Sequence, residues 1–284
     1  MANIGVRARP AARAPSFLGS GVPDLEDWRM TITQGSTQLQ EFASQYAAQG
    51  FVLVKGLLSK EEAAAYRQTS HELLSRLNRD DDPTWQSAMG LSGGKTRLRH
   101  LHDAQFYDAA FSRLLVDPRF TDVAAAVMGV ENVQLHHTKL FVKPPENGSP
   151  FPLHQDYPFF PHKYHRVGAA IFHFDDAPVE KGCVRILPGS HLQGPREHDP
   201  EGSYHLPDVP FESAVPQPAE AGDVLFFTYL TVHGSGVNVS NEPRTTWLVQ
   251  YRDPGDPPTV KTHDHSLGQG MMLRGVDPTG RSGA

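Results

Sequence analysis

Cysteine is nearly absent from this sequence, whose 284 residues include only Cys183. A single thiol cannot form an internal disulfide, so the disulfide frameworks of small secreted domains are excluded. A reducing compartment, the cytoplasm, is the expected location. Cys183 lies in the strand-like run from Gly182 to Leu187, which favours a buried core thiol over a nucleophile.

Long apolar runs, a basic surplus and internal repeats are also missing. No run approaches the roughly 18 apolar residues of a membrane span. The N-terminus lacks the apolar segment of a secretory signal. The formal net charge of −6 argues against a nucleic-acid groove, which needs a basic surplus on one face. The absence of a 20–50-residue repeat argues against a solenoid. We therefore expect a small-molecule substrate and neither a nucleic-acid nor a membrane partner.

The first half of the chain has a helical pattern. The composition, 38% hydrophobic and 20% charged, is that of a globular protein, and the length fits one domain, 1–284. We expect residues 1–30 to be flexible rather than a transit peptide. Ser59 and Glu62 form a capping box that predicts a helix ending near Leu77. The rest of this layer, 36–130, is predicted as helices 36–48, 108–116 and 119–128, a strand 51–54, and a loop or mobile flap 79–105.

From Val133 the pattern changes to short β-rich runs separated by Pro and Gly. Helices followed by strands favour a helical layer packed on a β core, so the fold class is mainly β with flanking helices. The core is expected at 131–252, with a long insertion at 188–221 and an irregular tail at 253–284. The predicted strands are 133–142, 151–156, 167–174, 183–187, 223–228 and 245–251.

The sharpest local feature is the sequence His154-Gln155-Asp156. Residues two apart in a strand point to the same face, so this imidazole and carboxylate can reach one metal ion. With a second imidazole they would form the two-histidine, one-carboxylate triad of non-haem Fe(II) oxygenases, which leaves three positions open. Alone the pattern is weak, because fifteen histidines make chance pairs common.

A second segment supplies the missing imidazole. An apolar run from Asp223 leads to His233, and Gly234 and Gly236 allow the backbone to pass close to a ligand. Arg244 could be a surface charge, but it opens the half-buried run Thr245–Tyr251. There it needs an anionic partner, such as a small dicarboxylate bound as a bidentate pair. Ser235 could donate to the same carboxylate.

Four motifs in order resemble the phytanoyl-CoA dioxygenase family of Fe(II)/2-oxoglutarate-dependent oxygenases. The resemblance covers about residues 36–252. The motifs are Lys143-Pro-Pro-Glu-Asn-Gly with Pro152-Leu-His-Gln-Asp156, Gly182-Cys-Val-Arg-Ile-Leu-Pro-Gly-Ser-His191, Gly222-Asp-Val-Leu-Phe-Phe, and His233-Gly-Ser-Gly with Arg244.

The resemblance implies a double-stranded β-helix, a cupin-like jelly-roll. It implies iron on His154, Asp156 and His233, and the far carboxylate of 2-oxoglutarate on Arg244 and Ser235. O2 is then the oxidant, and succinate and CO2 are released. Relatives that halogenate lack the ligand aspartate, which is present here. The resemblance also implies co-substrate contacts for Gln155, Lys139 and Thr138, and a basic residue among Arg99, His100 and His102.

Several functions remain open at this point. The leading one is a dioxygenase that hydroxylates or oxidatively cyclises a small natural-product substrate, since no basic cluster suits a nucleotide diphosphate. The alternative is an acyl-CoA hydroxylase like phytanoyl-CoA dioxygenase. A non-catalytic metal-binding jelly-roll would lack turnover. A cupin-type isomerase or hydrolase would use more histidines and no distal arginine.

Other candidate residues have structural explanations that we weigh against function. Asp175-Asp176 suggests a strand-end turn rather than an acid/base pair. The neighbours His136 and His137 should point to opposite faces of a strand. His263-Asp264-His265 repeats the ligand pattern but has no strand before it, so we do not expect metal there. The aromatic residues Tyr157, Phe159 and Phe160 line a pocket or pack in the core, and His162, His165, His173 and His191 are expected to be structural.

Overall fold

The computed structural model describes residues 25–77, 98–145, 148–199, 205–263 and 266–280. The chain divides into two units, Met1–Thr37 and Gln38–Ala284, and the features below belong to the second. Two expectations, flexibility of residues 1–30 and a loop or mobile flap at 79–105, lie for the most part outside the described residues, at 1–24 and 79–97. None of the described helices has the length and apolarity needed to cross a membrane.

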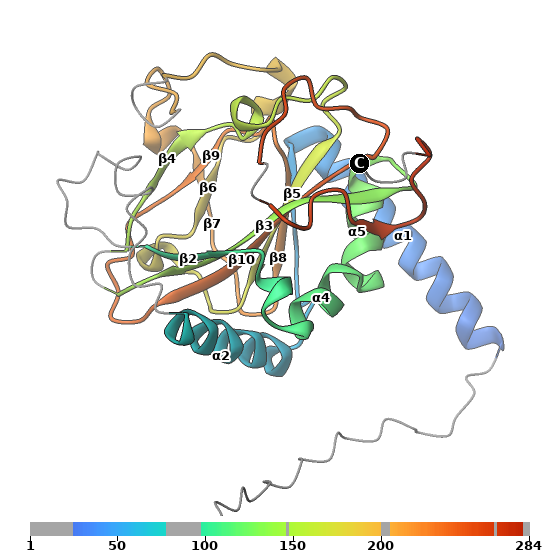
Figure 1. The fold of residues 1–284 in the computed structure, drawn as a ribbon, viewed down its shortest axis with the longest axis horizontal. Helices are drawn as coiled ribbons and strands as arrows, with labels where there is room; N and C mark the ends of the chain where they lie inside the picture. Colours follow the sequence, from blue (N-terminus) through green and yellow to red (C-terminus); the bar gives the residue numbers. More distant parts are fainter. Residues whose placement is uncertain (1–24, 78–97, 146–147, 200–204, 264–265, 281–284) are drawn as a thin grey trace, which may run out of the picture. The chain divides into compact units, whose positions relative to one another are not determined.

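Two antiparallel sheets form the core of the larger unit (Figure 1). The larger sheet has the order β1-β8-β5-β10-β3-β11, and β2 also pairs with β3. These strands are β1 (Phe51–Val54), β2 (Arg99–His102), β3 (Val133–Lys143), β5 (Val167–His173), β8 (Val224–Thr228), β10 (Arg244–Arg252) and β11 (Met272–Arg274). The smaller sheet has the order β4-β9-β6-β7, with β4 (Phe151–His154), β6 (Val184–Ile186), β7 (Val215–Gln217) and β9 (His233–Ser235).

The two sheets pack face to face through a small apolar layer. Phe51, Leu225 and Phe227 of the larger sheet meet Val184 and Ile186 of the smaller one. This face-to-face packing of curled antiparallel sheets confirms the predicted jelly-roll, or double-stranded β-helix. The space between the sheets is the interior, and the candidate site lies there.

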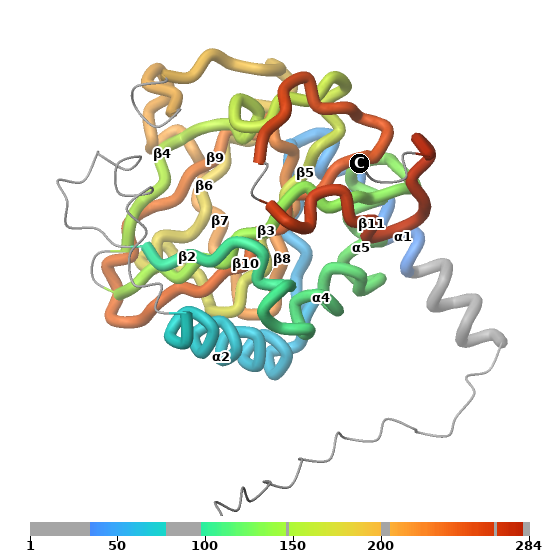
Figure 2. Tube along the Cα trace, in the orientation of Figure 1, coloured from blue at the N-terminus to red at the C-terminus, as the bar shows by residue number. Residues whose placement is uncertain are grey.

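Helices cover the outer face of the larger sheet (Figure 2). They are the part of α1 (Leu25–Gln49) that follows Thr37, α2 (Lys60–Arg76), α4 (Ala109–Leu115) and α5 (Pro118–Met128). The centre of this layer is aromatic: Phe111 lies 5.1 Å from Trp247, and Phe120 lies 5.2 Å from Phe172, between ring centroids. The predicted helical layer is therefore confirmed, although α1 begins well before residue 36. Short 3₁₀ turns connect the strands at Ala104–Phe106, Tyr157–Phe159, Val179–Lys181, Ser190–Gln193 and Phe211–Ser213.

Alternation along β10 separates the two faces of the larger sheet. Trp247, Val249 and Tyr251 lie in the core under the helices. Side chains in a strand alternate, so Arg244 and Gln250 point the other way, into the interior. On β3, Lys143 pairs with Arg244 and His137 with Gln250, so these β3 side chains share that interior face.

Four strands were not predicted, and each has a local reason. β2 lies in the stretch expected to be a loop, where it pairs with β3. β7, β9 and β11 have three residues each, too few to show a periodicity of two. β7 lies within the stretch expected to be an insertion, and Leu206 in the middle of that stretch packs in one cluster with Leu153 of β4.

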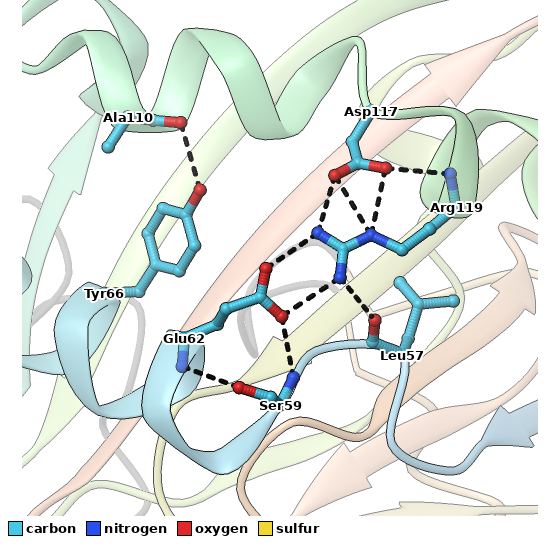
Figure 3. Close-up of polar contacts among 7 residues, drawn as sticks. All are labelled: Leu57, Ser59, Glu62, Tyr66, Ala110, Asp117 and Arg119. Carbon is cyan, nitrogen blue, oxygen red and sulfur yellow. Dashed lines mark hydrogen bonds and ion pairs between the residues drawn. The ribbon is translucent and has the colours of Figure 1, made fainter. Parts of the chain in front are cut away.

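A polar network joins α2 to α5 (Figure 3). Ser59 and Glu62 form the predicted capping box: Oγ of Ser59 accepts from the Glu62 N–H, and the Glu62 carboxylate accepts from the Ser59 N–H. Arg119 donates to both Glu62 carboxylate oxygens, at 2.9 and 3.0 Å, and to Asp117. This guanidinium lowers the pKa of Glu62.

We expect Glu62→Ala to lower the free energy of unfolding by about 1 kcal/mol near neutral pH, the usual value of a helix cap. A lowered carboxylate pKa stabilises the folded state above the unfolded value, 4.5, and this contribution disappears as the pH falls through the folded pKa. The difference from wild type in urea unfolding should therefore shrink below pH 4.5. Glu41→Ala is the control, and a pH-independent difference would contradict the assignment.

Candidate active site

Three potential ligands converge at the end of the smaller sheet. His154 ends β4 and His233 begins β9, and these two residues are paired in the sheet register. Nε2 of His154 lies 3.7 Å from Oδ1 of Asp156, and Nε2 of His233 lies 3.9 Å from the same oxygen. All three ligand atoms lie within 4.8 Å of one another, so they could hold one metal ion.

Backbone carbonyls fix the orientation of both imidazoles. Nδ1 of His154 lies 2.8 Å from the Pro152 carbonyl, and Nδ1 of His233 lies 2.9 Å from the Thr231 carbonyl. A carbonyl only accepts, so each Nδ1 carries the proton and each Nε2 keeps its lone pair for a metal. Burial lowers the pKa of His154 to about 4, which keeps the ring neutral.

Asp156 reaches the site by a turn rather than a strand. β4 ends at His154, and Asp156 has φ −75° and ψ −19° at the start of a 3₁₀ turn. The strand-alternation argument for this pair was therefore wrong, although the two ligand atoms do converge. Nε2 of Gln250 donates to Oδ2 of Asp156 at 2.5 Å, which leaves Oδ1 facing the imidazoles.

This donor set fits a divalent iron ion. Two neutral imidazoles and one carboxylate are the protein ligands of non-haem Fe(II) oxygenases, and they leave positions open for other ligands. Burial and the backbone bonds hold the set in place, so little ordering cost accompanies binding.

Arg244 is a buried cation without a carboxylate partner among the described residues. Its side chain is 4% exposed, Nη1 donates to the Gly182 carbonyl, and Nε is buried without a hydrogen-bond partner in the described part of the chain. Burial lowers its pKa to about 10, so the guanidinium stays charged at neutral pH. A buried cation with an unsatisfied donor needs an anionic ligand.

Lys143 is a second buried cation that the sequence analysis missed. It pairs with Arg244 in the sheet register and is fully buried. Nζ donates to Oγ of Ser235 and to the Gly236 carbonyl, each at 2.7 Å, and no described carboxylate forms an ion pair with it. Burial and Arg244 lower the pKa of Lys143. Lysine is seldom buried unpaired, so this position also calls for an anion.

Ser235 lies beside this cation pair, and Lys139 lies further along the interior face. Lys139 pairs with Leu248 and is an even number of residues from Lys143, so the two lysines point to the same face. Burial lowers the pKa of Lys139 to about 8, and the Asp156 carboxylate partly offsets this effect. His102 pairs with Lys139, so it shares this face.

Two predicted co-substrate contacts need correction. Thr138 lies on the opposite face of β3, where its hydroxyl donates to Gln105 at 2.7 Å under the helical layer. Gln155 is fully buried and its amide is used by backbone: it donates to the Gly194 and Leu230 carbonyls and accepts from the Arg196 N–H. Gln155 therefore anchors the following loop, and no amide hydrogen remains for a co-substrate.

The remaining basic candidates on β2 divide between two faces. His100 pairs with Phe141 and is buried, so it shares the interior face of His102. Arg99 pairs with Val142, which packs under the helices, and is exposed.

The aromatic residues after the ligand motif separate into two roles. Phe160 packs in a core with Val167 and Tyr229, together with the partly buried Tyr157. Phe159 is 37% exposed, with its ring 6.2 Å from that of His154, and so borders the site.

Other weighed residues hold the structure, as expected. Asp175 accepts from the Thr245 N–H and pairs with Arg67, and Asp176 accepts from the Ala221 N–H. Cys183 is buried. The structural interpretation holds for His162, His165 and His191, whose rings bond to Phe160 O, the Tyr229 hydroxyl and Ala47 O.

His173 is the exception, because it faces the interior. It pairs with Thr246, which points to the same face of β10 as Arg244. Its buried Nε2 has no hydrogen-bond partner among the described residues. Burial and the Arg244 charge lower its pKa to about 4, so a neutral imidazole lies near the cation pair.

The chain is similar to proteins named as dioxygenases and as non-heme alpha ketoglutarate dependent enzymes. Ectoine dioxygenase of Bordetella parapertussis is 27% identical, over 72% of each chain. The epimerase SnoN, solved with Fe3+, alpha ketoglutarate and nogalamycin RO, is 25% identical with a TM-score of 0.67, over 85% of this chain and 98% of that one. The carbocyclase SnoK from nogalamycin biosynthesis is 26% identical with a TM-score of 0.66, over 83% and 93%.

A family profile described as phytanoyl-CoA dioxygenase matches residues 46–246, more than half of the chain. The match includes strands of both sheets and every residue of the triad. Its relatives include dioxygenases and hydroxylases, and the solved neighbours SnoN and SnoK are alpha ketoglutarate dependent, SnoN with Fe3+ bound. The chain is therefore an iron- and 2-oxoglutarate-dependent oxygenase, a member of the phytanoyl-CoA dioxygenase family.

Proposed function

We propose that this enzyme oxidises an unactivated C–H bond of a polar natural-product molecule, by hydroxylation or oxidative ring closure. Iron is held by His154, Asp156 and His233. The observation that carries the proposal is this buried triad in an interior that also holds two cations without carboxylate partners among the described residues. Iron, 2-oxoglutarate and O2 supply the oxidising power when bound, with release of succinate and CO2.

The chain's own residues bind and orient the co-substrate. Arg244 and Lys143 receive the far carboxylate of 2-oxoglutarate, which would satisfy the unpartnered Nε and neutralise two buried charges. Ser235 positions Lys143 through its hydroxyl and can donate to the same carboxylate. The two imidazoles donate to backbone carbonyls, and Gln250 donates to Asp156. These hydrogen bonds orient the three ligand atoms toward one point.

The interior face beside Asp156 favours a polar substrate over an acyl chain. Lys139 and His102 are paired on β3 and β2, and Lys139 lies close enough to Asp156 for that carboxylate to raise the Lys139 pKa. Their N–H groups suit a molecule with several oxygen atoms, whereas an acyl chain needs apolar walls. The neighbours from nogalamycin biosynthesis agree with a natural-product substrate.

The test is a screen for substrate-stimulated succinate release with Fe(II), 2-oxoglutarate and O2. The panel contains oxygen-rich polyketides and glycosides, amino acids and acyl-CoA thioesters. We expect stimulation by an oxygen-rich member and none by the thioesters. Stimulation confined to acyl-CoA would assign the enzyme to acyl hydroxylation, and no turnover with any compound would favour a non-catalytic jelly-roll.

A further inference from the structure

A second group of histidines lies outside the triad. His136 and His137 are on β3, and His263 is in the segment that follows β10. One ring nitrogen from each lies within 4.8 Å of the others. The ring centroids are 4.3 to 5.1 Å apart, and those of the two imidazoles in the triad are 4.4 Å apart. In both clusters the potential ligand atoms therefore lie close enough together to hold one metal ion.

A β-bulge brings the two adjacent histidines together. The register between β10 and β3 shifts where Gln250 pairs with His137 and Tyr251 pairs with Leu135, so His136 is the extra residue. A bulge breaks the alternation of side chains, which is why the expected opposite orientation of His136 and His137 was wrong. Their Nδ1 atoms lie 2.7 Å apart.

His263 completes the group from an unusual backbone conformation. Its φ is +58°, in the left-handed region that residues other than glycine seldom adopt. Such strain persists where the surrounding structure requires one side-chain position. Here it places an imidazole 4.3 Å from that of His137, almost parallel to it.

From this geometry we propose that His136, His137 and His263 bind a second divalent transition-metal ion, of the zinc class. Imidazole nitrogen is a preferred ligand of zinc, copper and nickel, and three protein ligands leave one position for water or substrate oxygen. Zinc–nitrogen bonds of about 2.0–2.1 Å at tetrahedral angles separate ligand nitrogens by about 3.3 Å. The His136 and His137 nitrogens would thus move apart by about 0.6 Å as metal replaces their shared proton.

The residues around the three histidines determine which ring nitrogens can bind a metal ion. Burial lowers the pKa of His136 to about 2 and lowers that of His137 as well, so both rings are neutral, the form that binds metal. Gln269 bonds Nε2 of His136 at 3.2 Å, which leaves Nδ1 as its ligand atom. Rotation of that amide lets its oxygen accept a proton from Nε2, the usual partner of a metal-bound histidine. His162 is not a ligand, because Phe160 O and Arg252 occupy its nitrogens.

Zinc loading followed by exhaustive dialysis and metal analysis tests the proposal. We expect wild type to keep two equivalents of zinc, His263→Ala to keep one, and the control His191→Ala to keep two. Cobalt substitution adds a second readout, since a tetrahedral site has a stronger visible absorption than a six-coordinate one. That absorption should persist in Asp156→Gly and disappear in His263→Ala.

Two results would overturn the second site: a His263→Ala variant that keeps as much zinc as wild type, or an Asp156→Gly variant that keeps none. His263→Gln, which keeps a polar side chain in the partly buried position, guards against a folding defect and should also keep one equivalent. If the triad alone failed to bind metal, the difference in zinc content between wild type and His263→Ala would remain. The two metal assignments are therefore tested independently.

Discussion

Asp156→Gly is expected to abolish turnover and to weaken iron binding by more than about 100-fold. Outer groups that merely orient a metal ligand are worth about 10–100-fold in affinity, so loss of a ligand costs more. The carboxylate is the only negative charge in the triad, and its Oδ1 lies 3.7 and 3.9 Å from the two imidazole Nε2 atoms. Equilibrium dialysis against Fe(II) under anaerobic conditions and succinate release measure the two effects.

Two controls separate ligand loss from unfolding. Asp208→Gly removes an exposed carboxylate that pairs with Arg196, and it should behave like wild type. Asp156→Asn keeps an oxygen that can accept from Gln250, so it should fold normally and still lose most iron affinity. Normal hydroxylation rates in Asp156→Gly would mean that this carboxylate is not a ligand.

Arg244→Ala is expected to raise the KM for 2-oxoglutarate by about 100-fold, with a smaller effect on kcat at saturation. A charged hydrogen bond contributes about 1.5–3 kcal/mol, and each 1.4 kcal/mol is tenfold in affinity. The mutation removes one of two buried cations, and Lys143 remains to hold the carboxylate weakly. Titration of 2-oxoglutarate in the succinate assay measures the change.

The matched control is Arg166→Ala, whose guanidinium is 58% exposed and pairs with Asp253. It should leave the 2-oxoglutarate requirement unchanged. Lys143→Met is the companion variant: it should also raise KM, while the fold without co-substrate becomes no less stable, since an unpaired buried charge is removed. An unchanged KM in Arg244→Ala would place the far carboxylate elsewhere.

Much of the fold followed from local patterns in the sequence. The capping box at Ser59 depends on a few neighbouring residues, and it is present. The long strands β3 and β10 have enough residues to show their β character and were located to within one or two residues. Three-residue strands such as β9 form because two neighbours pair with them, and no local pattern encodes that.

The site was only partly predictable for the same reason. His154, Asp156 and His233 stand in motifs, but the groups that orient them are backbone carbonyls and Gln250, which come from pairing of distant segments. Lys143 was missed because its burial depends on register with Arg244. The available signal was that Lys143 and Lys139 are an even number of residues apart on one strand, so their side chains point to the same face.

The His136–His137–His263 cluster was beyond sequence reasoning because a bulge and a left-handed residue create it. The alternation rule gave the wrong orientation for His136. We discounted His263 because no strand precedes it, but a segment outside the strands can also supply a ligand. Asp264 and His265 of the same motif lie outside the described residues.

The most direct measurement is an anaerobic crystal structure with Mn2+ and 2-oxoglutarate. We predict one metal bonded to Nε2 of His154, Oδ1 of Asp156 and Nε2 of His233, with the far carboxylate of 2-oxoglutarate on Arg244 and Lys143. A metal bound away from these three atoms, or a carboxylate that leaves Arg244 unpartnered, would contradict the account.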